Sequence, residues 1–180
     1  AVHKPPAARK APAAHKPGKA PLRVLPEISV YSIEASTGLE LYSQNADTVR
    51  PPASMIKLAL MLLVSEGLEA GRWTLETPIT ASRHAEHMGG TQVYVKARET
   101  YPLGRLMLGI AVASANDAAM AVAEGLWGAE DAYLEAANQR IQQLGMTKSV
   151  FRSVHGLPPN RGEQPDDTTA RDMATLAREC

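Results

Sequence analysis

Several residue types and runs that define protein classes are scarce or missing. Cys180 is the only cysteine among 180 residues, so no internal disulfide can form. Residues 58–64 form an apolar run of seven, far short of the ~20 needed to cross a bilayer, so we expect no transmembrane segment. There is no glycine-rich phosphate loop or dinucleotide fingerprint, and His84 and His87 lack a third ligand at zinc-like spacing. We therefore expect no cofactor and no bound metal.

Charge is balanced overall but unevenly distributed. Residues 1–26 carry six basic residues, six prolines and no acidic residue, which leaves 13 basic against 19 acidic residues, a net charge of −6, in the remainder. This composition predicts a basic Pro/Ala/Lys-rich disordered linker over residues 1–26. No aromatic residue or nucleic-acid-binding motif accompanies it, so we expect no nucleic acid partner and favour a solvated tether.

A serine and a lysine three residues apart, Ser54 and Lys57, open the apolar run. Residues 57–64 are mostly helix formers that follow Pro51-Pro52, and their apolar character all round predicts a buried central helix. Positions three apart share a helical face, so the Ser54 hydroxyl and the Lys57 amine can meet, and apolar surroundings lower the pKa of a lysine. One interpretation is a nucleophile, Ser54, with its own base, Lys57. The alternative is a chance match in which Ser54 is an ordinary helix cap.

A second polar element, Ser114-Ala115-Asn116-Asp117, separates two apolar stretches, residues 106–113 and 118–123, that we predict as buried helices. One interpretation is helix capping by Asn116 or Asp117. In the other, Ser114 passes a proton toward a leaving group and the amide of Asn116 holds a substrate carbonyl. The residues alone leave both interpretations open.

The rest of the chain gives local predictions. Residues 28–43 combine β-forming residues with a Ser-Thr-Gly turn, which predicts an antiparallel hairpin. Apolar positions every four residues predict a helix from about Glu130 that ends at Gly145, with a core face made of Tyr133, Ala137 and Ile141. Thr169 and Asp172 resemble a capping box that opens a last helix.

Four pieces occur in an order that resembles the penicillin-binding D-alanyl-D-alanine carboxypeptidases. They are Pro-Ala-Ser-Met-Ile-Lys (52–57), Ala-Ser-Ala-Asn-Asp-Ala (113–118), His-Gly-Leu (155–157) and Thr-Thr-Ala-Arg-Asp-Met-Ala (168–174), and the similarity runs from about Leu25 to the end. The resemblance implies an α+β, β-lactamase/DD-peptidase-like transpeptidase fold with a helical subdomain and an antiparallel sheet. It also places His155 in a surface loop, where we expect a positional or packing role.

The family's Lys-Thr-Gly element is absent, since Thr147-Lys148 has the wrong order. Residues 27–180 therefore resemble an amino-terminal portion of a DD-peptidase catalytic domain, and we expect the sheet to be incomplete. Ala1 in place of methionine fits removal of an export signal, as would any start inside a longer sequence. The expected location is the periplasm or the exterior of the cell envelope.

The function that the resemblance implies is a serine-type D-Ala-D-Ala carboxypeptidase. It would act on the peptidoglycan pentapeptide through an acyl-enzyme at Ser54 and would also be acylated by β-lactam antibiotics. Lys57 would be the base, Ser114 the proton relay and Asn116 the substrate-binding residue. Three alternatives remain: a related DD-endopeptidase or β-lactamase, a non-catalytic module that binds cell-wall peptide, and a basic-armed structural protein.

Overall fold

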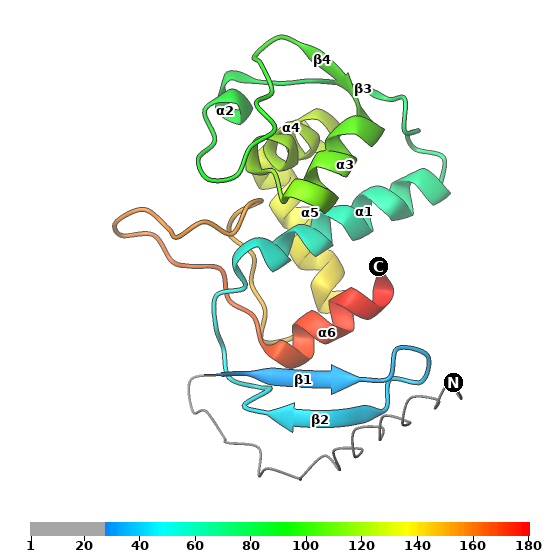
Figure 1. The fold of residues 1–180 in the computed structure, drawn as a ribbon, viewed down its shortest axis with the longest axis vertical. Helices are drawn as coiled ribbons and strands as arrows, with labels where there is room; N and C mark the ends of the chain where they lie inside the picture. Colours follow the sequence, from blue (N-terminus) through cyan, green and yellow to red (C-terminus); the bar gives the residue numbers. More distant parts are fainter. Residues whose placement is uncertain (1–27) are drawn as a thin grey trace, which may run out of the picture.

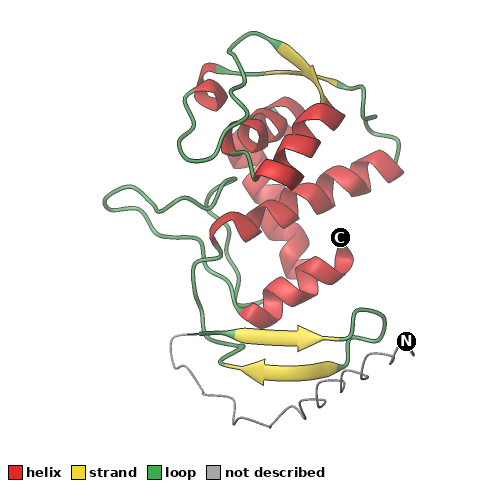
Figure 2. Cartoon of the chain, in the orientation of Figure 1, coloured by secondary structure: helices red, strands yellow, loops and turns green. Residues whose placement is uncertain are grey.

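A computed structural model describes residues 28–180, so the linker predicted for residues 1–26 lies outside the described residues. Helices form the middle of the molecule, with a two-stranded antiparallel sheet at each end (Figures 1 and 2). The elements in chain order are β1 (Val30–Ile33), β2 (Glu40–Gln44), the 3₁₀ turn η1 (Ala53–Ile56), α1 (Lys57–Glu69), β3 (Pro78–Thr80), α2 (Arg83–Glu86), β4 (Thr100–Pro102), α3 (Leu103–Ala113), α4 (Asn116–Trp127), α5 (Glu130–Gln143) and α6 (Ala170–Glu179). The predicted α+β class is confirmed.

Strands β1 and β2 form the predicted antiparallel hairpin, with Tyr31 opposite Ser43. Helix α6 lies against β1 (Figure 1), and the guanidinium of Arg171 stands 4.4 Å over the ring of Tyr31. The predicted start of this helix is confirmed, because Thr169 is the N-cap and its hydroxyl accepts from the Asp172 N–H. The reciprocal half of the capping box is not formed. The Asp172 carboxylate instead accepts from Ser149 at 2.7 Å, a buried contact that joins α6 to the preceding loop.

Helix α1 is the central helix, as its apolar character predicts, and it packs against α4, α5 and α6. The buried residues of its apolar run are Ala59, Leu60, Leu62, Leu63 and Val64. The predicted core face of α5 is also confirmed, since Tyr133, Ala137 and Ile141 are at most 1% exposed. Gly145 follows α5 with a φ of +80°, the left-handed conformation that ends a helix. The sequence pattern therefore located both the central helix and the core face of α5.

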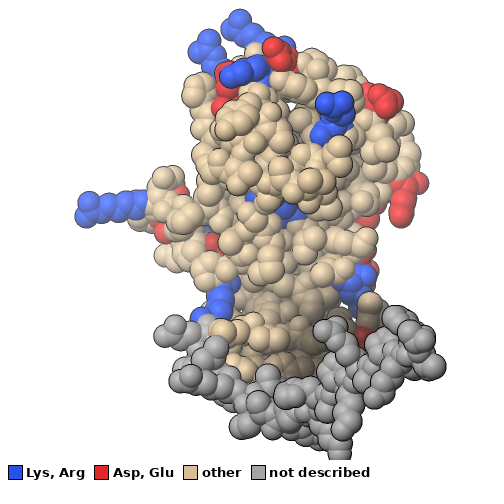
Figure 3. All heavy atoms as spheres, in the orientation of Figure 1, with Lys and Arg blue, Asp and Glu red and all other residues tan. Residues whose placement is uncertain are grey.

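Helix α4 is buried over residues 118–123 as predicted, but the prediction for α3 is wrong on one face. Leu106 and Ile110 pack inward, whereas the side chains of Leu108 and Val112 are 60% and 79% exposed. Figure 3 shows mostly uncharged atoms over α3 on this side of the molecule. Residues 106–113 are apolar all round the helix, yet its neighbours α4 and β4 cover only part of its circumference.

Strands β3 and β4 had no counterpart among the sequence predictions. Each strand has three residues: β3 starts with Pro78, and β4 ends with Pro102. Ile79 and Tyr101 form the central pair. Pairs this short carry no detectable alternation of apolar and polar residues. The segment that joins the two strands, residues 81–99, lies beside the start of α4.

None of the helices in residues 28–180 combines the length and the apolar character that spanning a membrane requires. In the same residues, no group of three or more His, Cys, Asp or Glu side chains is arranged to hold a metal ion.

Candidate active site

The Ser54 hydroxyl and the Lys57 amine meet, with 3.1 Å between Oγ and Nζ. They do so across the 3₁₀ turn η1, which precedes α1, rather than in the first turn of an α-helix as predicted. In a 3₁₀ turn the side chains at i and i+3 are eclipsed, so this geometry stacks the two groups directly. Ser54 is not a cap, because neither η1 nor α1 has a side-chain capping bond. Its side chain is exposed, whereas Lys57 is only 3% exposed.

The environment of Lys57 favours an uncharged amine. Burial lowers the pKa of Lys57 to about 8, since the ammonium loses its hydration in an apolar surrounding. Besides Ser54, the amine has one further acceptor, the main-chain carbonyl oxygen of His155 at 3.0 Å. About half of the lysine side chains are therefore neutral near pH 8, with the amine held beside a reachable hydroxyl.

Ser114 shares a cavity of about 330 Å³ with Ser54 and Lys57. Its position follows from the end of α3, where Ser114 adopts a left-handed conformation (φ 56°, ψ 36°) before α4 begins. The other walls of the cavity are apolar and come from η1, α1 and α3: Met55, Leu58, Met61, Ile110 and Ala111. The three predicted catalytic side chains thus line one small, mainly apolar space, and their catalytic roles remain predictions.

Asn116 does not line this cavity. It is 3% exposed, its amide nitrogen donates to the carbonyl oxygen of Gly89 at 2.8 Å, and its Oδ1 is buried without a partner among the described residues. The capping interpretation fails for Asn116, because Ala115 is the N-cap of α4, but the Asp117 carboxylate accepts from the N–H of Ala118 in the first turn of α4 at 2.8 Å. Asp117 is a structural residue: its buried carboxylate accepts from the N–H groups of Val93 and Val95, both at 3.0 Å.

Sequence reasoning missed the part of the site that the backbone supplies. The loop that follows α5 brings the His155 carbonyl to Lys57 across 98 residues of chain. Gly156 allows this approach, since it has a φ of +73° and a Cβ there would overlap the carbonyl of Ala53. Any residue type can supply a main-chain carbonyl, so the sequence gives no signal for this acceptor. From the residue type of His155, only a positional role could be expected.

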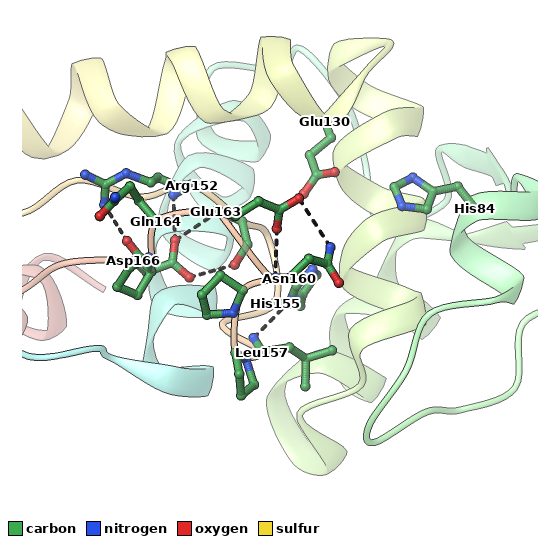
Figure 4. Close-up of a pocket in the computed structure, with 13 residues that line it drawn as sticks. His84, Glu130, Arg152, His155, Leu157, Asn160, Glu163, Gln164 and Asp166 are labelled. Carbon is green, nitrogen blue, oxygen red and sulfur yellow. Dashed lines mark hydrogen bonds between the residues drawn. The ribbon is translucent and has the colours of Figure 1, made fainter.

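His155 also lines a second cavity of about 280 Å³, whose walls do not include Ser54 or Lys57. Figure 4 shows this cavity, with Arg152 and Asp166 toward one end and His84 at the other. Burial lowers the pKa of His155, and it raises the pKa of Glu130, which lines the same space. His155 therefore serves two places, with its carbonyl bonded to Lys57 and the residue itself in the lining of the second cavity.

Comparison with known proteins fits this arrangement. Residues 25–180 match the D-alanyl-D-alanine carboxypeptidase family, peptidase S11. The chain is 35% identical over 151 residues to D-alanyl-D-alanine carboxypeptidase DacF of Bacillus subtilis, which covers 84% of this chain and 38% of the relative. The crystal structure of the carboxypeptidase DacD from Francisella tularensis superposes with a TM-score of 0.80 at 33% identity, over 95% of this chain and 40% of that one. Penicillin binding protein 5 from Haemophilus influenzae gives 0.79 at 25% identity, over 89% and 46%.

These neighbours confirm the predicted DD-peptidase-like fold, with helices beside small antiparallel sheets and a sheet that is incomplete in this chain. The chain spans about two fifths of the length of DacF and DacD. Three observations indicate the same family: the match over residues 25–180, the order of the sequence elements and the shared fold. The chain belongs to the D-alanyl-D-alanine carboxypeptidase family of serine peptidases.

Proposed function

We propose that this protein hydrolyses the terminal D-Ala-D-Ala bond of peptidoglycan stem pentapeptides through an acyl-enzyme on Ser54, and that β-lactams acylate the same hydroxyl. One observation carries the proposal: the buried amine of Lys57 lies 3.1 Å from the exposed hydroxyl of Ser54. A hydroxyl becomes nucleophilic when a neutral base takes its proton during attack. Lys57 is suited to that task because burial brings its pKa to about 8.

Acylation then follows from the positions of these groups. Ser54 attacks the carbonyl carbon of the penultimate D-alanine while Lys57 accepts the hydroxyl proton. The backbone N–H of Ser54, in the first turn of η1 where helical N–H groups lack partners within the helix, supplies one donor to the oxyanion. The bond to the terminal D-alanine breaks as Ser114, in the same cavity, relays a proton to the departing amine.

Deacylation reverses the roles of these groups. A water molecule gives a proton to the neutral lysine and attacks the ester carbon, and Lys57 returns the proton to the Ser54 oxygen as the ester bond breaks. Asn116 orients the peptide in this scheme. For that, its amide must exchange the Gly89 carbonyl for a substrate carbonyl, a substitution of one acceptor by another of the same kind.

Labelling by a fluorescent penicillin tests the nucleophile directly. We expect the wild-type protein to be labelled and Ser54→Ala to lose the label. Ser65→Ala is the matched control, because Ser65 is exposed and lies on the helix that follows η1. Labelling of Ser54→Ala at the wild-type level would refute the assignment.

The reaction products separate the related hydrolases. A carboxypeptidase releases free D-alanine from a pentapeptide, an endopeptidase cleaves cross-linked dimers, and a β-lactamase turns penicillin over. These assays require the longest product of the gene, since the chain contains no Lys-Thr-Gly element and spans about two fifths of its relatives. Binding of cell-wall peptide without any turnover by that product would favour a non-catalytic module.

The proposal includes a place and an organisation for the protein. In it, residues 27–180 belong to the amino-terminal portion of the catalytic domain, and residues 1–26 are the basic Pro/Ala/Lys-rich segment that precedes it in the sequence. Export to the periplasm or the outer face of the envelope brings the enzyme to its polymer. Fractionation of cells that express the longest gene product, followed by penicillin labelling, measures that location.

A further inference from the structure

Asp166 is a buried carboxylate that lies outside the cavity of Ser54. It is 6% exposed, and both of its oxygens are occupied by the start of one loop. Oδ1 accepts from the N–H of Arg152 at 2.5 Å and from the N–H of Ser153 at 3.0 Å, and Oδ2 accepts from the Ser153 hydroxyl at 2.7 Å. The Arg152 guanidinium pairs instead with Asp167 at 3.0 Å. Asp166 therefore organises backbone rather than neutralising a cation.

Ser153 passes this organisation along the loop. Its hydroxyl donates to Asp166 and accepts from the N–H of Gly156 at 2.9 Å. The next N–H, that of Leu157, donates to Nδ1 of His155 at 3.0 Å (Figure 4). Because Nδ1 accepts a hydrogen bond, the ring is neutral with its proton on Nε2, and burial lowers the pKa of His155 in the same direction. Side chains thus hold two consecutive N–H groups of the 153–157 turn.

The turn ends against the candidate active site. Gly156 packs on the carbonyl of Ala53, directly before Ser54 in the chain, with no room for a Cβ. In that position the carbonyl oxygen of His155 is 3.0 Å from Nζ of Lys57. A continuous set of contacts therefore runs from Asp166, through Ser153 and the turn, to the amine.

We propose that Asp166 is a positioning residue for Lys57: acting through Ser153, it holds the 153–157 turn so that the His155 carbonyl orients the amine toward Ser54. This inference rests on the proposed function. A neutral amine has two N–H bonds and one lone pair. With one N–H directed at the carbonyl, the lone pair can face the Ser54 hydroxyl, so proton transfer needs no prior rotation of the side chain.

The experiment compares two neighbouring carboxylates. Asp166→Ala is expected to slow acylation by a fluorescent penicillin about tenfold or more, the effect of losing roughly one oriented hydrogen bond. The pH midpoint of acylation is expected to rise, because a loosened turn admits water to Lys57, whose low pKa depends on burial. Asp167→Ala is the matched control: it removes the same charge from the same loop but leaves the turn contacts in place. Asp166→Asn keeps an oxygen for the two N–H groups and should retain most of the rate.

A second variant and an NMR titration test the inference if Asp166→Ala does not fold or if the protein is not labelled. If Asp166→Ala does not fold by circular dichroism, Ser153→Ala replaces it, since that variant keeps the two backbone contacts of Asp166 and removes the hydroxyl that joins Asp166 to the N–H of Gly156. The titration of Lys57 followed by NMR needs no activity and should move upward in Asp166→Ala but not in Asp167→Ala. A labelled wild type with equal rates and equal Lys57 titrations in the two variants overturns this inference alone. An unlabelled wild type overturns the proposed function, and the titration then decides whether Asp166 controls the lysine.

Discussion

The pH dependence of stability is expected to report on Lys57. Burial lowers the pKa of this lysine from 10.5 to about 8 in the folded chain. Between these values the unfolded chain binds more protons, so the free energy of unfolding rises with pH across this window. At about 1.4 kcal/mol for each pH unit of the window, the ammonium destabilises the folded chain by about 3 kcal/mol at pH 7. This loss is recovered as the pH rises through 8 to 10.5.

Lys57→Met removes the ammonium and should remove this dependence. Urea unfolding of both proteins at pH 7 and pH 10.5 gives the difference in unfolding free energy between variant and wild type. We expect that difference to favour the variant by about 3 kcal/mol more at pH 7 than at pH 10.5. The hydrogen bonds to Ser54 and His155 are lost at both pH values and largely cancel.

Lys96→Met measures the effect of deleting a surface lysine, because the Lys96 side chain is 60% exposed. The pH-dependent change at Lys57 should clearly exceed the change at Lys96. A difference between Lys57→Met and wild type that stays constant from pH 7 to pH 10.5 would refute the argument. It would mean that the amine is charged and hydrated in the folded protein, and unsuited to act as a base.

Two substitutions test the packing around the site. Gly156→Ala should lower the free energy of unfolding by about 2 kcal/mol or more, because a left-handed φ and an overlap with Ala53 act together. Gly145→Ala, with a similar φ but open space around the new Cβ, should cost less in the same thermal unfolding assay, and equal costs would contradict the overlap. Tyr133→Phe should leave stability unchanged or raise it by up to about 1 kcal/mol, since the buried hydroxyl has no partner among the described residues. A loss above about 1 kcal/mol in urea unfolding would show that the hydroxyl is bonded.

The parts of the fold that could be predicted from sequence are those that local physics determines. The apolar run at 58–64 specified a buried helix, and the four-residue spacing of Tyr133, Ala137 and Ile141 specified the core face of α5. Thr169 marked the first turn of α6 because an N-cap acts within three residues of chain. The contact between Ser54 and Lys57 was predicted from their spacing, although a 3₁₀ turn and not the first turn of an α-helix forms it.

The features that could not be predicted depend on distant segments. The carbonyl of His155 reaches Lys57 only because the chain after α5 returns to η1. Asn116 turns to Gly89, a contact across 27 residues that removes it from the cavity of Ser54. The exposed face of α3 could not be predicted from the local sequence either. Where apolar residues surround a helix, the pattern does not indicate which side other elements will cover.

At Ser114 the residue type that would best suit the backbone conformation differs from the one that supplies a hydroxyl to the cavity. A left-handed residue with a Cβ carries roughly 1–2 kcal/mol of steric cost, which glycine would relieve. Glycine, however, would take away the hydroxyl from the wall of the cavity. Selection for thermal stability alone would favour glycine in place of Ser114. A protein that uses the Ser114 hydroxyl to transfer a proton must keep the serine and its strained backbone between α3 and α4. Engineering for robustness should therefore begin at other positions.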